Sequence, residues 1–199
     1  MNLQSKALGR VLKNKTLWLV AILLLLEGFF FYTRTGWTPA LMMSKGATPE
    51  LAGLITSINF WVAIPTVLLV PRLAYKLGVR KPFLWVTSII EAIFALVAIN
   101  ANLSMSWLLM VLVGAADNTR LVFTLALPVE LMPEEDVGTA SGLILSIGFI
   151  GTIIGPLTGG HILDLTGSLD ISLIVLAVVA LAAAGIAFRL PETGVKPEG

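Results

Sequence analysis

The sequence predicts an all-α membrane protein with six transmembrane helices. Of its 199 residues, 57% are apolar and 13% are charged, and the mean hydropathy is +0.94. Soluble domains are about 45–50% apolar and about 25% charged, so the composition excludes a soluble globular enzyme. Six apolar runs use nearly all of the chain, and each is about as long as the roughly 20 residues that a bilayer core requires.

Charged or turn-forming residues bound these six runs. They cover Thr16 to Met43, Leu51 to Pro71, Pro82 to Ala101, Ser104 to Leu131, Val137 to Leu163, and Ile171 to Phe188. The second and sixth runs carry no charge, as expected of membrane spans. The others keep the same flanks, although charges interrupt the first (Glu27, Arg34), the third (Glu91) and the fourth (Asp117, Arg120, Glu130).

The positions of lysine and arginine predict the orientation. They gather before the first span (Lys6, Arg10, Lys13, Lys15), between the second and third (Arg72, Lys76, Arg80, Lys81), and after the sixth (Arg189, Lys196). The connections after the first, third and fifth spans hold only Lys45. Because basic residues mark cytoplasmic connections, we expect both termini to be cytoplasmic. We predict a basic segment over residues 1–15, a membrane domain over 16–189 and a tail over 190–199, in a prokaryotic cytoplasmic membrane.

The sequence lacks the residues that several kinds of chemical site require. The chain has no cysteine and one histidine, His161, so we expect no disulfide, no metal site and no cofactor. Neither a Gly-x-Ser-x-Gly motif nor a phosphate-binding glycine loop occurs, so we do not expect an enzyme. A net charge of +1 gives no reason to expect nucleic acid. A channel would need a charged ring or carbonyl filter, of which the sequence carries no signature.

The connection between the second and third spans carries a family resemblance. Its residues Pro71 to Lys81, PRLAYKLGVRK, resemble the loop signature Gly-x-Leu-Ala-Asp-Arg-x-Gly-Arg-Lys of the major facilitator superfamily. Proline replaces the first glycine, and Tyr75 replaces the aspartate, which the second half of these transporters often lacks. The resemblance makes this a candidate gating loop, formed by Arg72, Lys76, Gly78 and Arg80, but the role of the aspartate does not carry over.

Two later stretches agree with this resemblance in the expected order. Residues 138–168, rich in glycine, resemble the eleventh span of the superfamily, and Leu190-Pro191-Glu192-Thr193 resembles the end of its twelfth. Family members usually have twelve spans in two six-span halves, each half built from two inverted three-helix repeats. The resemblance therefore implies the C-terminal half of a major facilitator fold.

Small residues four apart recur in the fifth span. They are Gly138, Gly142, Gly151, Gly155 and Gly159, with Pro156 among them. Residues at this spacing share a helix face and let a neighbouring backbone approach closely. The sequence leaves two roles open, tight helix packing or a hinge that bends during transport.

Charged residues lie at membrane depth in the first and fourth spans. At 1.5 Å per residue, Glu27 lies about 15 Å into its span, with Arg34 two turns further, while Asp117 and Arg120 are one turn apart. Two interpretations stay open. The charges serve packing, with Asp117 and Arg120 as an internal pair, or they line a substrate or proton path, since such groups are costly in lipid. Asn59 joins them as a polar candidate, whereas Glu91 suits an internal hydrogen bond.

The main hypothesis is a secondary active transporter, or half of one. It would move a small polar solute by alternating access, coupled to protons through Glu27 or Asp117, with Arg34 or Arg120 meeting the substrate. Besides lipid and solute, its partner would be a second six-span half. That half is a second copy, another chain, or part of a longer form of this one. The alternative is a non-transporting membrane subunit or receptor that uses the half-fold for assembly.

Overall fold

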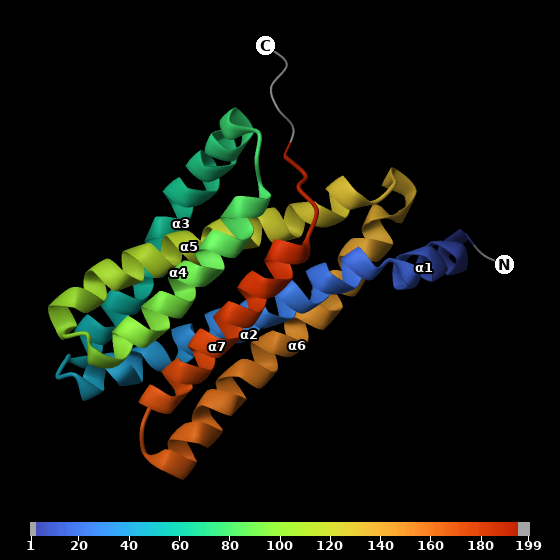
Figure 1. Ribbon diagram of the computed structural model, residues 1–199. Coiled ribbons are helices and arrows are strands. Elements are labelled where there is room, and N and C mark those ends of the chain that lie inside the picture. Colours follow the sequence, from blue (N-terminus) through green and yellow to red (C-terminus); the bar gives the residue numbers. More distant parts are fainter. Residues whose placement is uncertain (1–2, 195–199) are drawn as a thin grey trace.

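The computed structural model describes residues 3–194 of the chain (Figure 1). Lys196 of the predicted tail and the side chain of Lys6 lie outside the described residues. Seven helices form in this part, and six are long and apolar enough to cross a membrane. They are α1 (Leu3–Lys13), α2 (Lys15–Ser44), α3 (Pro49–Leu77), α4 (Lys81–Asn100), α5 (Leu103–Leu131), α6 (Glu134–Thr166) and α7 (Asp170–Arg189).

The six predicted spans are confirmed as α2 to α7, and the largest differences lie at helix ends. We placed the end of the second span at Pro71, but α3 continues to Leu77. Hydropathy marks where the apolar side chains end, whereas a helix continues until its backbone is capped. Gly78 ends α3 in the left-handed region, with φ of 65°, and Val79 N–H donates to the Ala74 carbonyl over 3.2 Å. Glycine adopts this conformation without strain.

The basic N-terminal segment, for which we predicted no helix, contains α1. This helix packs against α6 and α2, with Ala7 and Val11 buried and Leu8 and Leu12 exposed. Arg10 donates to Asp136 at the start of α6 over 2.6 and 2.7 Å. α1 is therefore fastened to the membrane domain at the end where α6 begins.

The helices form two inverted repeats, as the fold class predicts. Each span in α2–α3–α4 has a counterpart in α5–α6–α7 that runs in the opposite direction. α2 packs along α6 as α5 packs along α3, and α2 contacts α7 as α5 contacts α4. If α2, α3 and α4 are exchanged with α5, α6 and α7, the α2–α6 contact becomes the α5–α3 contact, and the α2–α7 contact becomes the α5–α4 contact. The α2–α5 and α4–α7 contacts are unchanged by the exchange. The six spans thus form one half of a major facilitator fold.

Glycines allow α2 and α6 to pack closely. A methyl group at Gly155 would lie 2.6 Å from the Phe29 carbonyl oxygen, and one at Gly151 would overlap the backbone of Leu25. At Gly159 it would meet the indole of Trp37, which donates to the Pro156 carbonyl over 3.2 Å.

Gly138 and Gly142 lie outside this contact, because a methyl group at either would meet nothing within 4 Å. The predicted packing stripe is therefore shorter than its spacing suggested. Of the predicted glycines, it contains Gly151, Gly155 and Gly159. Gly148, which we did not predict, extends it, because a methyl group there would lie 2.6 Å from the Leu24 side chain.

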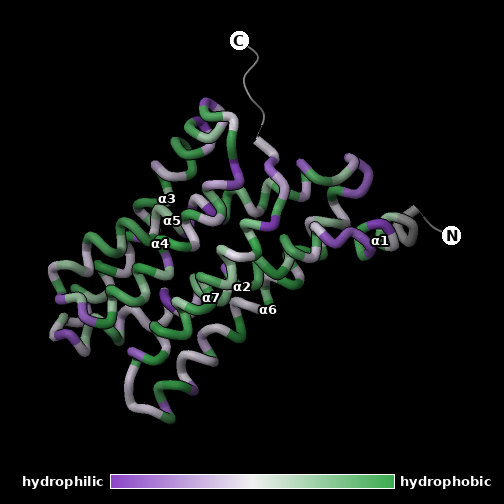
Figure 2. The backbone as a smooth tube through the Cα atoms, in the orientation of Figure 1, coloured by the Kyte–Doolittle hydropathy of each residue, from purple (hydrophilic) through white to green (hydrophobic). Residues whose placement is uncertain are grey.

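Apolar side chains cover the outside of the spans. On α4 and α7, exposed residues repeat every three or four positions, at Val86, Ile90, Ile93 and Leu96 and at Ile171, Ile174, Val178 and Leu181. Such stripes are suited to lipid. Figure 2 shows hydrophobic residues along the spans and most of the hydrophilic ones at their ends.

Polar contacts join the connections at the end of the molecule where both described termini lie (Figure 1). Arg80 forms an ion pair with Glu130, and the backbone N–H groups of Arg80 and Gly194 donate to Glu192 over 2.7 and 2.8 Å. Partial burial would raise the pKa of Glu192, but these backbone hydrogen bonds lower it below its ordinary value.

Candidate functional site

Three residues from three helices form a buried polar contact at the centre of the bundle. Arg34 of α2 donates to Asp117 of α5 over 2.6 Å and to the side-chain oxygen of Asn59 of α3 over 3.0 Å. All three residues are at most 3% exposed. We predicted these residues as site candidates from their depth in the spans, and the fold brings them together.

A second buried contact joins α5 to α4. Arg120 donates to Glu91 and to Ser88, the latter over 3.0 Å, and all three side chains are fully buried. The internal Asp117–Arg120 pair that we considered is absent from the described ion pairs. Each of the two residues has instead an oppositely charged partner on a neighbouring helix, Arg34 on α2 and Glu91 on α4.

Glu27 of α2 lies between these contacts without a hydrogen bond of its own. Its side chain is 5% exposed, and Arg120 Nε lies 3.7 Å from its Oε2 atom. That distance is within reach of charge attraction but too long for a hydrogen bond. Neither carboxylate oxygen has a hydrogen-bond partner in the described structure.

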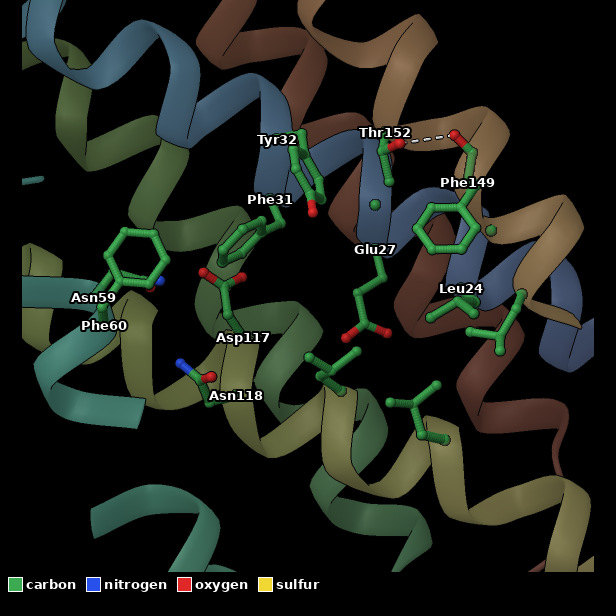
Figure 3. Close-up of a pocket in the computed structure, with 15 residues that line it drawn as sticks. Leu24, Glu27, Phe31, Tyr32, Asn59, Phe60, Asp117, Asn118, Phe149 and Thr152 are labelled. Carbon is green, nitrogen blue, oxygen red and sulfur yellow. Dashed lines mark hydrogen bonds between the residues drawn. The ribbon is translucent and has the colours of Figure 1, made fainter. Parts of the chain in front are cut away.

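A cavity of about 420 Å³ opens beside Glu27 (Figure 3). Its lining comes from α2, α3, α5 and α6 and is mostly apolar. The polar and aromatic residues that line it are Glu27, Phe31, Tyr32, Asn59, Phe60, Asp117, Asn118, Phe149 and Thr152. α4 and α7 supply none of the lining residues. Each of the two three-helix repeats thus contributes two helices to the cavity, α2 and α3 from the first and α5 and α6 from the second.

The predicted gating loop lies away from this cavity. Arg72 and Lys76 are exposed on the last turns of α3, Gly78 caps that helix, and Arg80 pairs with Glu130. None of these residues lines the cavity in the described structure. Their role as a gate stays a prediction.

Several residues around the site were not predicted from the sequence. For Glu91 we predicted an internal hydrogen bond, and the structure contains one, because Arg120 donates to it and Glu91 does not line the cavity. A carboxylate in an otherwise apolar span was the signal for such a bond, but the sequence did not identify Arg120 as the partner. The aromatic residues Phe31, Tyr32, Phe60 and Phe149 had no such signal, because aromatic side chains also face lipid and protein cores.

Comparison with known proteins supplies the family. The model of the Major Facilitator Superfamily matches residues 20–199. The chain is 26% identical over 192 residues to the uncharacterized transporter YycB of Bacillus subtilis, which covers 93% of this chain and 46% of the relative. It is 24% identical over 191 residues to the lysosomal dipeptide transporter MFSD1 of Danio rerio, covering 92% and 41% of the two proteins.

An uncharacterized protein of Archaeoglobus fulgidus is 26% identical over 145 residues, which covers 72% of this chain and 67% of the relative. The chain spans less than half the length of the two relatives named as transporters. Six spans with inverted repeats and a central polar site therefore correspond to part of those longer proteins.

Proposed function

Because the chain belongs to the major facilitator superfamily, we propose that it is a six-helix half of a secondary active transporter for a small polar solute. The observation that carries the proposal is the cavity beside Glu27 and Asp117, at the centre of α2 and α5. Charged groups at this depth are costly, and they are typical of substrate or ion pathways. A buried ion pair is also weak evidence for a purely stabilising role, since apolar residues often replace one without loss of stability.

The proposed mechanism is alternating access around this cavity. Two six-helix halves would rock against each other, and the cavity would open in turn to each side of the membrane. The lysines and arginines before α2, between α3 and α4, and after α7 place both termini on the cytoplasmic side in this proposal. The membrane is then the cytoplasmic membrane of a prokaryote, consistent with the Bacillus relative.

The proposal requires a second half to complete the cavity. The cavity is lined from α2, α3, α5 and α6, and large apolar residues nearby are exposed, among them Phe60, Trp61 and Phe149. A second copy would pair about a two-fold axis along the membrane normal. An N-terminal half, on another chain or on a longer form of this one, would cover the same face.

Proton coupling is assigned to the carboxylates that line the cavity. Glu27 and Asp117 both line it, and the buried cluster contains one acid more than it has bases, counting Glu91. Uptake of one proton would balance that charge. We assign the proton to Glu27, since Asp117 already accepts from Arg34.

A non-transporting subunit or receptor is the second candidate. The Arg34–Asp117 and Arg120–Glu91 pairs are complete within this half, as a purely structural role would require. Glu27 opposes this candidate, because its carboxylate lies 3.7 Å from Arg120 without a hydrogen bond in the described structure, and a buried acid without a hydrogen bond is costly.

Proteoliposomes test the proposal directly. The purified chain is reconstituted as its native assembly, and solute-dependent proton flux is recorded with an internal pH dye. Since one relative is named as a dipeptide transporter, dipeptides belong in the first solute panel, together with amines, amino acids and small carboxylic acids.

We expect at least one solute to drive proton flux, and Glu27→Gln to abolish it. The matched control is Glu135→Gln, which removes an exposed acid at the start of α6, outside the cavity. If a folded assembly with a completed second half moves no solute of the panel and no protons, the subunit candidate replaces the transporter.

A further inference from the structure

We propose that the cavity binds a cationic ammonium group, held against Glu27 and surrounded by aromatic rings. The inference rests on the proposed role of this cavity as the solute site, and it specifies the chemical class of that solute. The class is an organic amine, protonated or quaternary, with a small apolar body. Four features of the described structure support it: charge balance, the position of Glu27, the aromatic lining and the absence of a basic side chain from the lining.

The charge balance leaves one acid in excess. The buried cluster contains three carboxylates, Glu27, Glu91 and Asp117, and two guanidinium groups. Arg34 pairs with Asp117 over 2.6 Å, and Arg120 pairs with Glu91. Glu27 shares Arg120 with Glu91, since Arg120 Nε lies 3.7 Å from Glu27 Oε2, so the cluster keeps one negative charge in excess. Excess charge in a buried cluster is expensive. A bound cation would restore neutrality.

The geometry directs that excess charge toward the cavity. Glu27 points into the open space between α2, α5 and α6 (Figure 3), and it lines the cavity. Its side chain is 5% exposed, and both of its carboxylate oxygens lack a hydrogen-bond partner in the described structure. Arg120 Nε lies 3.7 Å from Oε2, too far for a hydrogen bond. Because a buried polar atom normally has a partner, the two carboxylate oxygens beside the cavity have room to accept from a further donor. An ammonium group supplies such donors as well as the opposite charge.

Aromatic rings surround the same space. Phe31, Tyr32, Phe60 and Phe149 all line the cavity, and Figure 3 shows them on α2, α3 and α6 around Glu27 and Asp117. The face of an aromatic ring attracts a cation within about 6 Å of its centroid. Phe31 already does so, since the Arg34 guanidinium carbon lies 5.5 Å from its centroid. Aromatic rings around a carboxylate are typical of sites that recognise organic cations.

The lining disfavours an anionic solute. Glu27 and Asp117 are the charged residues that line the cavity, and neither an arginine nor a lysine is among the described lining residues. A carboxylate solute would meet two acids, while Arg34 and Arg120 lie outside the lining and each already forms an ion pair with an acid. A neutral solute would supply no positive charge to the deprotonated Glu27, whereas an ammonium group would take the place of the proton. A volume of about 420 Å³ has room for an amine with one small ring or chain.

Three probes of equal size test the proposal. They are 2-phenylethylammonium, the neutral 2-phenylethanol and the anionic phenylacetate, each measured by equilibrium dialysis against the reconstituted native assembly in nanodiscs. Empty nanodiscs correct for partition into lipid. We expect the ammonium probe to bind about tenfold or more tighter than the alcohol, which corresponds to about 1.4 kcal/mol, and the anion to bind most weakly.

Substitutions in the cavity test whether it is the source of the preference for the ammonium probe. Glu27→Gln should bring the ammonium and alcohol affinities to within about twofold of each other, whereas Glu27→Asp, which keeps the charge, should retain the preference. Phe149→Leu should weaken ammonium binding without reversing the order of the probes. Glu135→Gln is the matched control and should leave all three affinities unchanged, because Glu135 lies on the surface outside the cavity.

The inference is wrong if the wild-type protein binds the alcohol or the anion as tightly as the ammonium probe. It is equally wrong if a folded Glu27→Gln variant keeps the full preference. Should that variant fail to fold, the wild-type probe series with Glu27→Asp and Phe149→Leu decides the matter. Selective ammonium binding without transport would contradict the proposed function alone, whereas transport of neutral or anionic solutes without that selectivity would contradict this inference alone.

Discussion

Arg120 is the residue on which the buried cluster depends most. It is fully buried and pairs with Glu91, and Glu27 Oε2 lies 3.7 Å from its Nε atom. Removing one partner of a buried pair leaves the other charge uncompensated, which costs about 3–5 kcal/mol. We therefore expect Arg120→Ala to lower the free energy of unfolding by about that amount, measured by denaturation in mixed detergent micelles.

The double variant Arg120→Met with Glu91→Leu removes both charges of the pair but keeps most of the side-chain volume. Apolar residues of similar volume often replace a buried ion pair without loss, so we expect this variant to recover most of the stability lost in Arg120→Ala. If Arg120→Ala unfolds as the wild-type protein does, the Arg120–Glu91 pair is not important for folding.

Which charges pair could not be predicted from the sequence. Depth along a span follows from residue number, and it placed Glu27, Arg34, Asp117 and Arg120 inside the membrane at different depths. Pairing depends on how each helix is rotated about its axis and on which helices are neighbours. Asp117 and Arg120 are one turn apart on α5, yet each meets a partner from another helix. A single sequence contains no direct record of those contacts.

The contact between α2 and α6 determines how closely the two repeats approach each other. At Gly151, an added methyl group would overlap the Leu25 backbone and lie 3.0 Å from the Phe29 nitrogen. Backbone atoms cannot move aside as a flexible side chain does. We expect Gly151→Ala to separate the helices and to lower the free energy of unfolding by about 1–3 kcal/mol, the usual cost of overpacking.

Gly185 provides a control of opposite sign. It lies within α7, and a methyl group there would meet nothing within 4 Å. Alanine is a better helix former than glycine by up to about 1 kcal/mol, so Gly185→Ala should be neutral or slightly stabilising in the same assay. Equal destabilisation by both substitutions would mean that close packing at Gly151 is not the cause.

Element boundaries were more accessible to prediction than contacts between elements. Apolar runs between charged connections located all six spans, because a bilayer requires long apolar segments and internally paired backbones. The helix α1 was missed, since its sequence is polar overall and its helix is fastened by Arg10 to Asp136 of α6. Glycine spacing located part of the α2–α6 contact, but it could not distinguish Gly155 from Gly142, where an added methyl group would meet nothing within 4 Å in the described part of the chain.

At the scale of the whole molecule, the proposed transporter needs two halves. A solute cavity lined from one half alone stays open on the side that its partner would cover. We expect the native mass of the chain in nanodiscs, after subtraction of lipid and scaffold, to be twice its 21.2 kDa. Mass photometry or light scattering at several protein concentrations measures this.

A stable monomer over that range would contradict the homodimer. Transport would then require an N-terminal half from elsewhere, and co-expression with such a half becomes the relevant reconstitution. A dimer that forms only at high concentration would be a weak association, unsuited to a completed translocation pathway.

The exposed surface of α3 affects how the protein is degraded in a cell. Of the six spans, α3 has the smallest buried share within its own chain, and many of its large apolar residues, such as Trp61 and Leu68, are exposed. A helix with so much exposed apolar surface depends on whatever covers that surface. We expect chaperones and proteases of membrane quality control to recognise copies in which α3 stays uncovered. The cellular abundance of the chain would then rise and fall with the amount of the partner half that covers α3.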